Sequence, residues 1–151
     1  MRIHHDTIYA AVLIFELAND RVLSEAELEE IERHEFTGIA PSLLQKELIH
    51  LICSEDKTDA DDRRSAYWAL GKRFDASLIP FFRDQLRIEQ QRDVDAVYQI
   101  LIALDNLNEP VFGGDRGGSY SLLDKELNWI DAGRYLSTLL RSPVACIHVR
   151  C

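Results

Sequence analysis

The sequence of 151 residues lacks any apolar run of the roughly 20 residues that a helix needs to cross a bilayer. Its longest apolar run, Ile8–Phe15, is short and is interrupted by Tyr9. The segment Met1–Asp6 also lacks the apolar stretch and small-residue cleavage site of a secretory signal. We therefore expect no membrane segment and a cytoplasmic location.

Cysteine is scarce, and neither cysteine nor histidine shows the spacing of a metal site. The three cysteines, Cys53, Cys146 and Cys151, are odd in number and lack a second Cys/His pair at zinc-finger distance. Cys53 lies in an apolar run and is interpreted as a buried small hydrophobic residue. His4 and His5 are adjacent, so on a helix they would point about 100° apart. We expect no metal and no cofactor.

Positive charge is also in short supply. Lys and Arg number 17 against 26 Asp and Glu, which gives a formal net charge of −9. Nucleic acids and anionic membranes attract positive surfaces, so this balance argues against both as partners. An acidic chain suits a basic protein partner, because complementary charge accelerates encounter. The alternative that the acidic composition serves only solubility stays open.

No local motif points to catalysis. The acidic cluster Asp59, Asp61 and Asp62 lacks a base at a useful spacing. The loop Gly113–Gly118 lacks the Gly-Lys-Ser/Thr ending of a phosphate loop, and no predicted strand precedes it. It is interpreted as a flexible connector whose Asp115–Arg116 tip could touch a partner. We predict no catalytic residue, and the chain is not predicted to be an enzyme.

The apolar residues that are present follow helical spacing. A first helix is predicted over Asp6–Leu17, with Asp6 as its cap. Ser24 and Glu27 form the capping box of a second helix, and Pro41 suits the first turn of a third. No segment predicts a strand, so the fold class is all-α.

The middle of the chain resembles a HEAT repeat. Asp62–Asp75 has the basic residues, small central residues and Ala-Leu-Gly ending of the first HEAT helix, followed by an aspartate in the turn. Ala76–Leu86 resembles the second helix of the same repeat. Gly71 is expected to end the first helix in the left-handed conformation. Ala103–Leu104 matches Ala69–Leu70 at a separation of 34 residues, with an aspartate in place of the glycine.

The resemblance implies a short α-solenoid, a HEAT-like stack of antiparallel helical hairpins with about seven to eight helices. The whole chain, 1–151, is predicted to form a single domain. Its parts are capping helices in 1–56, the hairpin and a partial second repeat in 57–112, the glycine loop 113–118, and closing helices with a tail in 119–151.

HEAT-like proteins generally bind other macromolecules through a curved surface. A short, acidic, helical chain is also similar to the immunity proteins of bacterial toxin systems, including those of contact-dependent growth inhibition. That resemblance implies a tight complex with one basic toxin domain, whose active or substrate-binding face is occluded. Tyr67 and Trp68 are assigned to the core. The candidate partner-binding residues are exposed acids and aromatics: Asp59, Asp61, Asp62, Asp93, Asp95, Tyr98, Asp105, Glu109, Asp115, Tyr120 and Trp129.

Two alternatives stay open. A HEAT-like accessory or lyase-type protein would need a deep apolar pocket with converging polar groups. A helical repeat like those of DNA-repair proteins would need the basic residues of the middle segment to share one face. These are Arg63, Arg64, Lys72, Arg73, Arg83 and Arg87.

Overall fold

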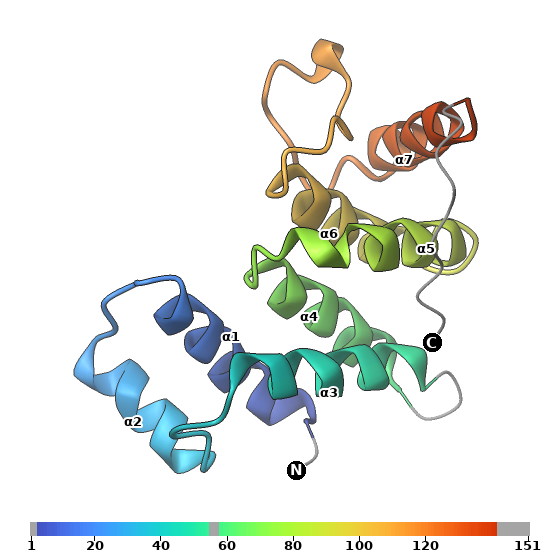
Figure 1. Ribbon diagram of the computed structural model, residues 1–151. Coiled ribbons are helices and arrows are strands. Elements are labelled where there is room, and N and C mark those ends of the chain that lie inside the picture. Colours follow the sequence, from blue (N-terminus) through green and yellow to red (C-terminus); the bar gives the residue numbers. More distant parts are fainter. Residues whose placement is uncertain (1–2, 55–57, 142–151) are drawn as a thin grey trace. The chain divides into compact units, whose positions relative to one another are not determined.

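The computed structural model describes residues 3–54 and 58–141 (Figure 1). In these two ranges the chain is all-helical, with seven α-helices, two short 3-10 helices and no β-strand. The predicted all-α class is therefore confirmed. The chain divides into two compact units, with the boundary between Arg73 and Phe74. Each unit is described by itself.

The first unit contains α1 (His5–Ala18), α2 (Glu25–Arg33), α3 (Pro41–Cys53) and α4 (Ala60–Gly71). Helix α1 packs against the other three, and α3 also packs against α4. Most of α1 is buried, which fits its continuous apolar run. The shared core comprises Ile8, Val12, Phe15, Leu44, Leu48, Ile52, Ala66, Tyr67 and Leu70.

Two of the three predicted helix starts in this unit are confirmed. Ser24 N–H donates to Glu27 Oε2 at 2.8 Å, and Glu27 N–H donates to Ser24 Oγ at 3.3 Å. Pro41 is the first residue of α3, where its missing N–H costs no helical bond. Asp6 is not the cap of α1, because that helix already begins at His5. There the His4 N–H donates to Thr7 Oγ1 at 3.0 Å, which leaves Asp6 inside the first turn.

Gly71 does not end α4 in the left-handed conformation, so that prediction is wrong. The right-handed turn continues past it, since Lys72 N–H donates to Ala69 O and Arg73 N–H donates to Leu70 O, each at 3.0 Å. The first positive φ after α4 is that of Phe74, at 49°. Gly71 is instead a buried residue of the last turn of α4.

The second unit contains η1 (Ala76–Leu78), α5 (Ile79–Glu89), α6 (Val94–Asp105), η2 (Gly114–Arg116) and α7 (Lys125–Leu140). Helix α6 packs against both α5 and α7, and α5 also contacts α7. A single closing helix, α7, follows the glycine loop. The core of the unit comprises Leu78, Phe81, Phe82, Leu86, Val97, Ile100, Leu101, Leu104, Ala132 and Tyr135.

Helices α4 and α6 correspond at the separation of 34 residues that the sequence indicates. Both contain 12 residues, and both begin directly after an aspartate cap, Asp59 or Asp93. Leu70 and Leu104, which are equivalent in this correspondence, are both fully buried. Within its unit α4 packs against α3, and α6 packs against α5. The unit boundary falls inside the hairpin that the sequence predicts over 62–86, so the stacking of hairpins as HEAT repeats stays a prediction.

Cys53 is the last residue of α3 and is half-buried and disulfide-bonded. Its interpretation as a buried small hydrophobic residue is therefore wrong. Cys146 and Cys151 lie outside the described residues, as does the rest of the tail after Arg141.

We predict that the equivalent core leucines of the two units stabilise the fold to a similar extent. Leu70→Ala and Leu104→Ala should each lower the free energy of unfolding by about 2–5 kcal/mol, because each removes a fully buried side chain and leaves a cavity. Urea unfolding monitored by circular dichroism measures the loss. Leu140→Ala is the control. It removes a side chain that is 83% exposed and should change stability by less than about 0.5 kcal/mol.

Candidate protein-binding surface

Exposed large apolar side chains gather in one short stretch of the second unit. Leu123 is 83% exposed and Trp129 is 47% exposed, and three neighbours have similar exposure to Trp129. Single exposed apolar residues are ordinary, whereas contiguous ones mark interaction sites. The five residues, all within 122–130, are Leu122, Leu123, Leu127, Trp129 and Ile130.

Helix α7 explains why these side chains remain exposed. Its buried residues recur at spacings of three and four along one side of the helix: Asn128, Asp131, Ala132, Tyr135 and Leu136. Leu127 and Ile130 lie three residues apart and outside that buried stripe, so α6 does not cover them. Both residues have the helical spacing that fits the closing helices predicted in 119–151. The spacing of apolar residues alone does not show which side of a helix is buried when apolar residues lie on two sides.

The loop before α7 is tied to the helix by a buried ion pair. Arg116 Nη1 lies 2.6 Å from Asp131 Oδ2, and the two side chains are only 4% and 2% exposed. Arg116 Nη2 also donates to Asn128 Oδ1 at 3.2 Å, and the Gly113 N–H donates to Asp131 Oδ1 at 3.2 Å. The interpretation of Arg116 as part of an exposed loop tip is therefore wrong.

Two aromatic rings complete the surroundings of Arg116. Phe112 and Tyr120 stack with their ring centroids 3.7 Å apart and an interplanar angle of 12°. The Arg116 guanidinium carbon lies 5.6 Å from the centroid of Phe112 and 5.7 Å from that of Tyr120. This distance permits cation–π attraction. The rings thus hold the two ends of the loop together, beside the ion pair to α7.

The loop keeps one charged residue at its exterior. Asp115 is 72% exposed, and its Oδ1 lies 3.9 Å from Arg134 Nη1. A Cβ on Gly113 would lie 2.1 Å from Arg134 Nη1 and 2.3 Å from Asp115 Oδ1. Glycine at this position therefore provides the space in which the Asp115–Arg134 pair approaches the backbone. We call the exposed part of residues 112–130 the loop–α7 surface.

Three predicted partner-binding residues lie on the loop–α7 surface. They are Asp115, the half-buried Tyr120 and Trp129. The indole N–H of Trp129 donates to the Gln90 carbonyl oxygen at 3.1 Å. This bond orients the ring while about half of it remains exposed.

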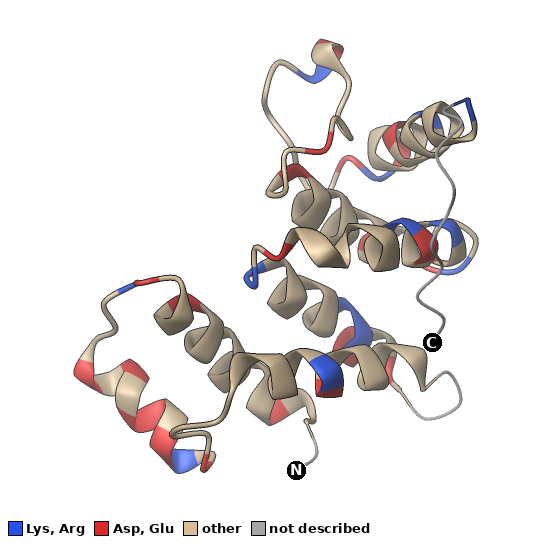
Figure 2. Ribbon diagram, in the orientation of Figure 1, with Lys and Arg blue, Asp and Glu red and all other residues tan. Residues whose placement is uncertain are grey.

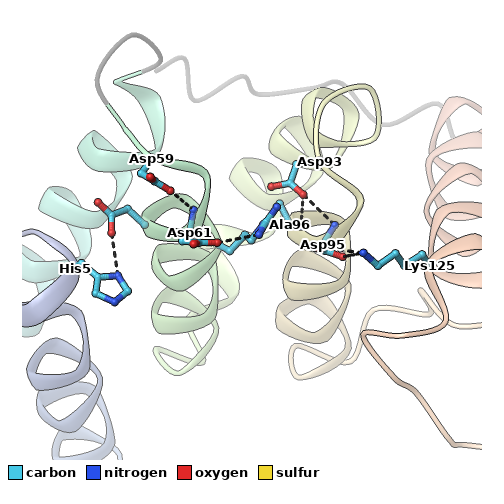
Figure 3. A network of polar contacts seen from close by, with 9 residues as sticks. His5, Asp59, Asp61, Asp93, Asp95, Ala96 and Lys125 are labelled. Carbon is cyan, nitrogen blue, oxygen red and sulfur yellow. Dashed lines mark hydrogen bonds and ion pairs between the residues drawn. The ribbon is translucent and has the colours of Figure 1, made fainter.

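Several of the predicted acids cap helices or form ion pairs within their own unit (Figure 3). Asp59 accepts from the Asp61 N–H at 2.7 Å, and Asp93 accepts from the Asp95 N–H at 3.1 Å. The second acid of each pair meets a cation: Asp61 Oδ1 lies 2.9 Å from Arg64, and Asp95 lies 3.1 Å from Lys125. Such caps and pairs give each acid a structural role that composition alone does not reveal.

The remaining predicted residues are dispersed. Asp62 lies 3.0 Å from His5 Nδ1. Tyr98 is half-buried, and Asp105 is exposed at the end of α6. Of the two aromatics assigned to the core, Tyr67 is fully buried and Trp68 is half-buried.

Glu109 belongs to a polar cluster that links α5 to α7. Arg83 Nη2 lies 2.7 Å from Glu109 Oε2, Arg83 Nε donates to the Tyr135 hydroxyl at 2.8 Å, and that hydroxyl donates to Glu109. Burial raises the pKa of Tyr135 above its usual value, and the hydrogen bond to Glu109 raises it further. Glu109 thus stabilises the fold from a position that is only partly accessible.

A second acidic feature, absent from the sequence predictions of partner residues, lies on α2. Figure 2 shows α2 as a helix marked largely by acidic residues. Glu25, Glu29 and Glu32 are exposed at spacings of four and three, and the exposed Leu28 lies on the same side. We call these four residues the outer face of α2. The glutamates are visible as a run in the sequence. The sequence alone does not mark them as a binding site, because the solvent-exposed side of any amphipathic helix carries such residues.

The basic residues of the DNA-binding alternative are mostly occupied by other contacts. Arg63 is buried, while Arg64, Arg83 and Arg87 form ion pairs with acids of their own unit. Arg73 donates to Gln45 at 3.0 Å. Little of their positive charge is therefore available to neutralise phosphates.

Comparison with protein-family models finds no matching family, and no curated protein and no solved structure matches the chain. Within residues 3–54 and 58–141, no group of three or more histidine, cysteine or acidic side chains is placed to hold a metal ion. None of the helices in these ranges combines the length and apolar character required to cross a membrane.

We predict that Asp59 and Asp93 act chiefly as helix caps. Asp59→Ala and Asp93→Ala should each lower the free energy of unfolding by about 1 kcal/mol, because each leaves backbone N–H groups of a helix start without an acceptor. Asp105→Ala is the matched control. Its carboxylate lies at the C-terminal end of α6, where the helix dipole disfavours it, so no loss is expected. Equal losses for all three variants in urea unfolding would contradict the assignment.

Tyr135 should make stability depend on pH in the alkaline range. Its pKa is higher in the folded chain than in the unfolded chain, so the folded state retains the proton more strongly. The contribution of Tyr135 is then complete below about pH 10, the ordinary tyrosine pKa, and is lost as the pH rises above it. The difference in unfolding free energy between wild type and Tyr135→Phe should therefore be constant from pH 7 to 9 and shrink above pH 10. A difference that stays constant to pH 11 would refute this.

Proposed function

We propose that the chain is a protein-binding scaffold that docks its partner on the loop–α7 surface. The observation that supports this most directly is the group of five exposed apolar side chains beside a loop held by a buried ion pair. A partner that covers this apolar surface gains a free energy of about 25 cal/mol for each Å² removed from water. Aromatic residues are enriched in protein interfaces and among the residues that carry most of the binding energy, so Trp129 is the expected anchor.

The partner we propose is a basic protein. The chain carries a net charge of −9, and the outer face of α2 carries three glutamates. Like charges at such spacings oppose helix formation by a few tenths of a kcal/mol each. Glu32 also lies at the C-terminal end of α2, where the dipole disfavours an acid. A basic partner would be attracted by the net negative charge over a distance before the apolar contact forms.

In its specific form, the proposal is an immunity protein that neutralises a cognate bacterial toxin domain. Its helical hairpins would stack as a short HEAT-like solenoid, and the partner's active or substrate-binding face would be covered in a one-to-one complex. Support comes from the correspondence of α4 and α6, the short acidic chain and the exposed apolar surface. A cytoplasmic location fits a protein that protects the cell producing the toxin.

The test uses the polypeptides encoded beside this chain's gene as defined probes. Each is co-expressed with the full chain, and growth protection is scored together with the mass of the purified complex. Isothermal titration calorimetry then gives the dissociation constant. Ile130→Glu should weaken binding about 30-fold or more, because it replaces an exposed apolar side chain of the loop–α7 surface with a carboxylate.

Leu140→Glu provides the matched control, since it introduces the same charge at an exposed leucine of the same helix outside the patch. It should leave the dissociation constant within about twofold of wild type. Equal effects of the two variants would refute the loop–α7 surface as the docking site. If no neighbouring product binds and duplex DNA binds with a steep salt dependence instead, the protein-binding function is wrong.

A further inference from the structure

The glycine loop has a composition that resists ordering. Four of the six residues in Gly113–Gly118 are glycine, and glycine loses more backbone freedom on folding than any other residue. Gly117 and Gly118 also have φ of 61° and 73°, a region in which other residues are strained. A loop of this kind is mobile in isolation, so its contacts must offset a large loss of entropy.

The contacts that offset this loss converge on one residue of α7. Asp131 accepts the Arg116 guanidinium at 2.6 Å through Oδ2 and the Gly113 N–H at 3.2 Å through Oδ1. It therefore holds the loop at its first residue and at its only arginine. Asn128, one helical turn earlier, accepts from Arg116 at 3.2 Å and donates to the Ser121 carbonyl oxygen at 2.9 Å. These two side chains of α7 fix the loop at three points.

We infer that Asp131 and Arg116 are positioning residues that pre-order the loop as a recognition element of the loop–α7 surface. This inference rests on the proposed function and names the part of the surface that the fold prepares. A buried ion pair adds little to stability compared with apolar packing of the same volume. The pair does, however, set the position of Asp115 and of the leucines after Tyr120. A loop that is already ordered avoids the entropy loss that a mobile loop would suffer on binding.

Hydrogen exchange of the full chain, measured by mass spectrometry, tests the ordering without a partner. In wild type, the amides of Gly113, Arg116 and Ser119 donate hydrogen bonds to Asp131 Oδ1, Gly113 O and Arg116 O, respectively, and should exchange slowly. Asp131→Asn should raise exchange in a peptide covering 112–121 at least about tenfold, because it removes the nearer and more buried of the two carboxylates that pair with Arg116 and leaves only Asp124, at 3.4 Å. Arg116→Lys should give a smaller increase, since lysine retains the charge but not the planar fork.

Lys125→Gln is the control, because it removes an ion pair of α7, to Asp95, that does not involve the loop. It should leave loop exchange unchanged. Peptides from α5 and α6 report whether Asp131→Asn unfolds the unit, and they should retain wild-type exchange. If exchange in the loop is the same in Asp131→Asn and wild type, the inference is overturned.

The affinity for the partner found in the co-expression test distinguishes a role of the loop in partner recognition from a role of Asp131 in loop order alone. With the loop released, the dissociation constant should rise about tenfold in Asp131→Asn. It should remain within about twofold in Arg87→Gln, which removes an ion pair of α5, to Asp84, outside the loop–α7 surface. Faster loop exchange with unchanged affinity overturns the recognition role while the protein-binding function stands. Absence of binding by wild type removes the proposed function and with it the recognition role.

Discussion

The fold depends on the fact that its helices are too short to be stable alone. They contain 9 to 16 residues, and isolated helices of this length are marginal in water. Each unit therefore places one helix between others: α1 contacts α2, α3 and α4, while α6 contacts α5 and α7. The apolar stripes facing these helices supply the stability. Side chains outside the stripes are then free to serve a partner.

Features that depend on neighbouring residues could be predicted from the sequence. The Ser24–Glu27 capping box and the start of α3 at Pro41 require only local chemistry, and both are observed. The separation of 34 residues marks the ends of α4 and α6 because the same cap and the same apolar residues recur. The end of α4 was not predictable in this way. Glycine is typical of a left-handed helix end, but the right-handed turn continues through Lys72 and Arg73, and the positive φ falls at Phe74.

The candidate surface was less predictable, because it depends on which of two apolar sides of α7 becomes buried. Leu127 and Ile130 have the spacing of core residues, yet α7 buries Asn128 and Asp131 instead. A buried asparagine and aspartate are unfavourable without partners. Arg116 and the backbone of the loop supply those partners, and they come from a segment whose glycine content predicts mobility. The buried side of α7 is thus determined by contacts between its polar residues and a separate loop, and the spacing of apolar residues in the sequence does not predict such contacts.

The acids illustrate how charge can have structural and interaction roles in one chain. Asp59 and Asp93 satisfy helix starts, and Asp95 and Glu109 pair with cations of their own unit. These acids contribute less to an external field than their formal charge suggests, because a nearby cation or helix dipole compensates them. Glu32, at the C-terminal end of α2, has no such compensation from the helix dipole. Long-range attraction of a basic protein would come from the net charge of −9, whereas the short-range contact of the proposed complex depends on apolar side chains of α7. Because screening by salt affects the first and hardly the second, ionic strength should change the association rate more than the dissociation rate.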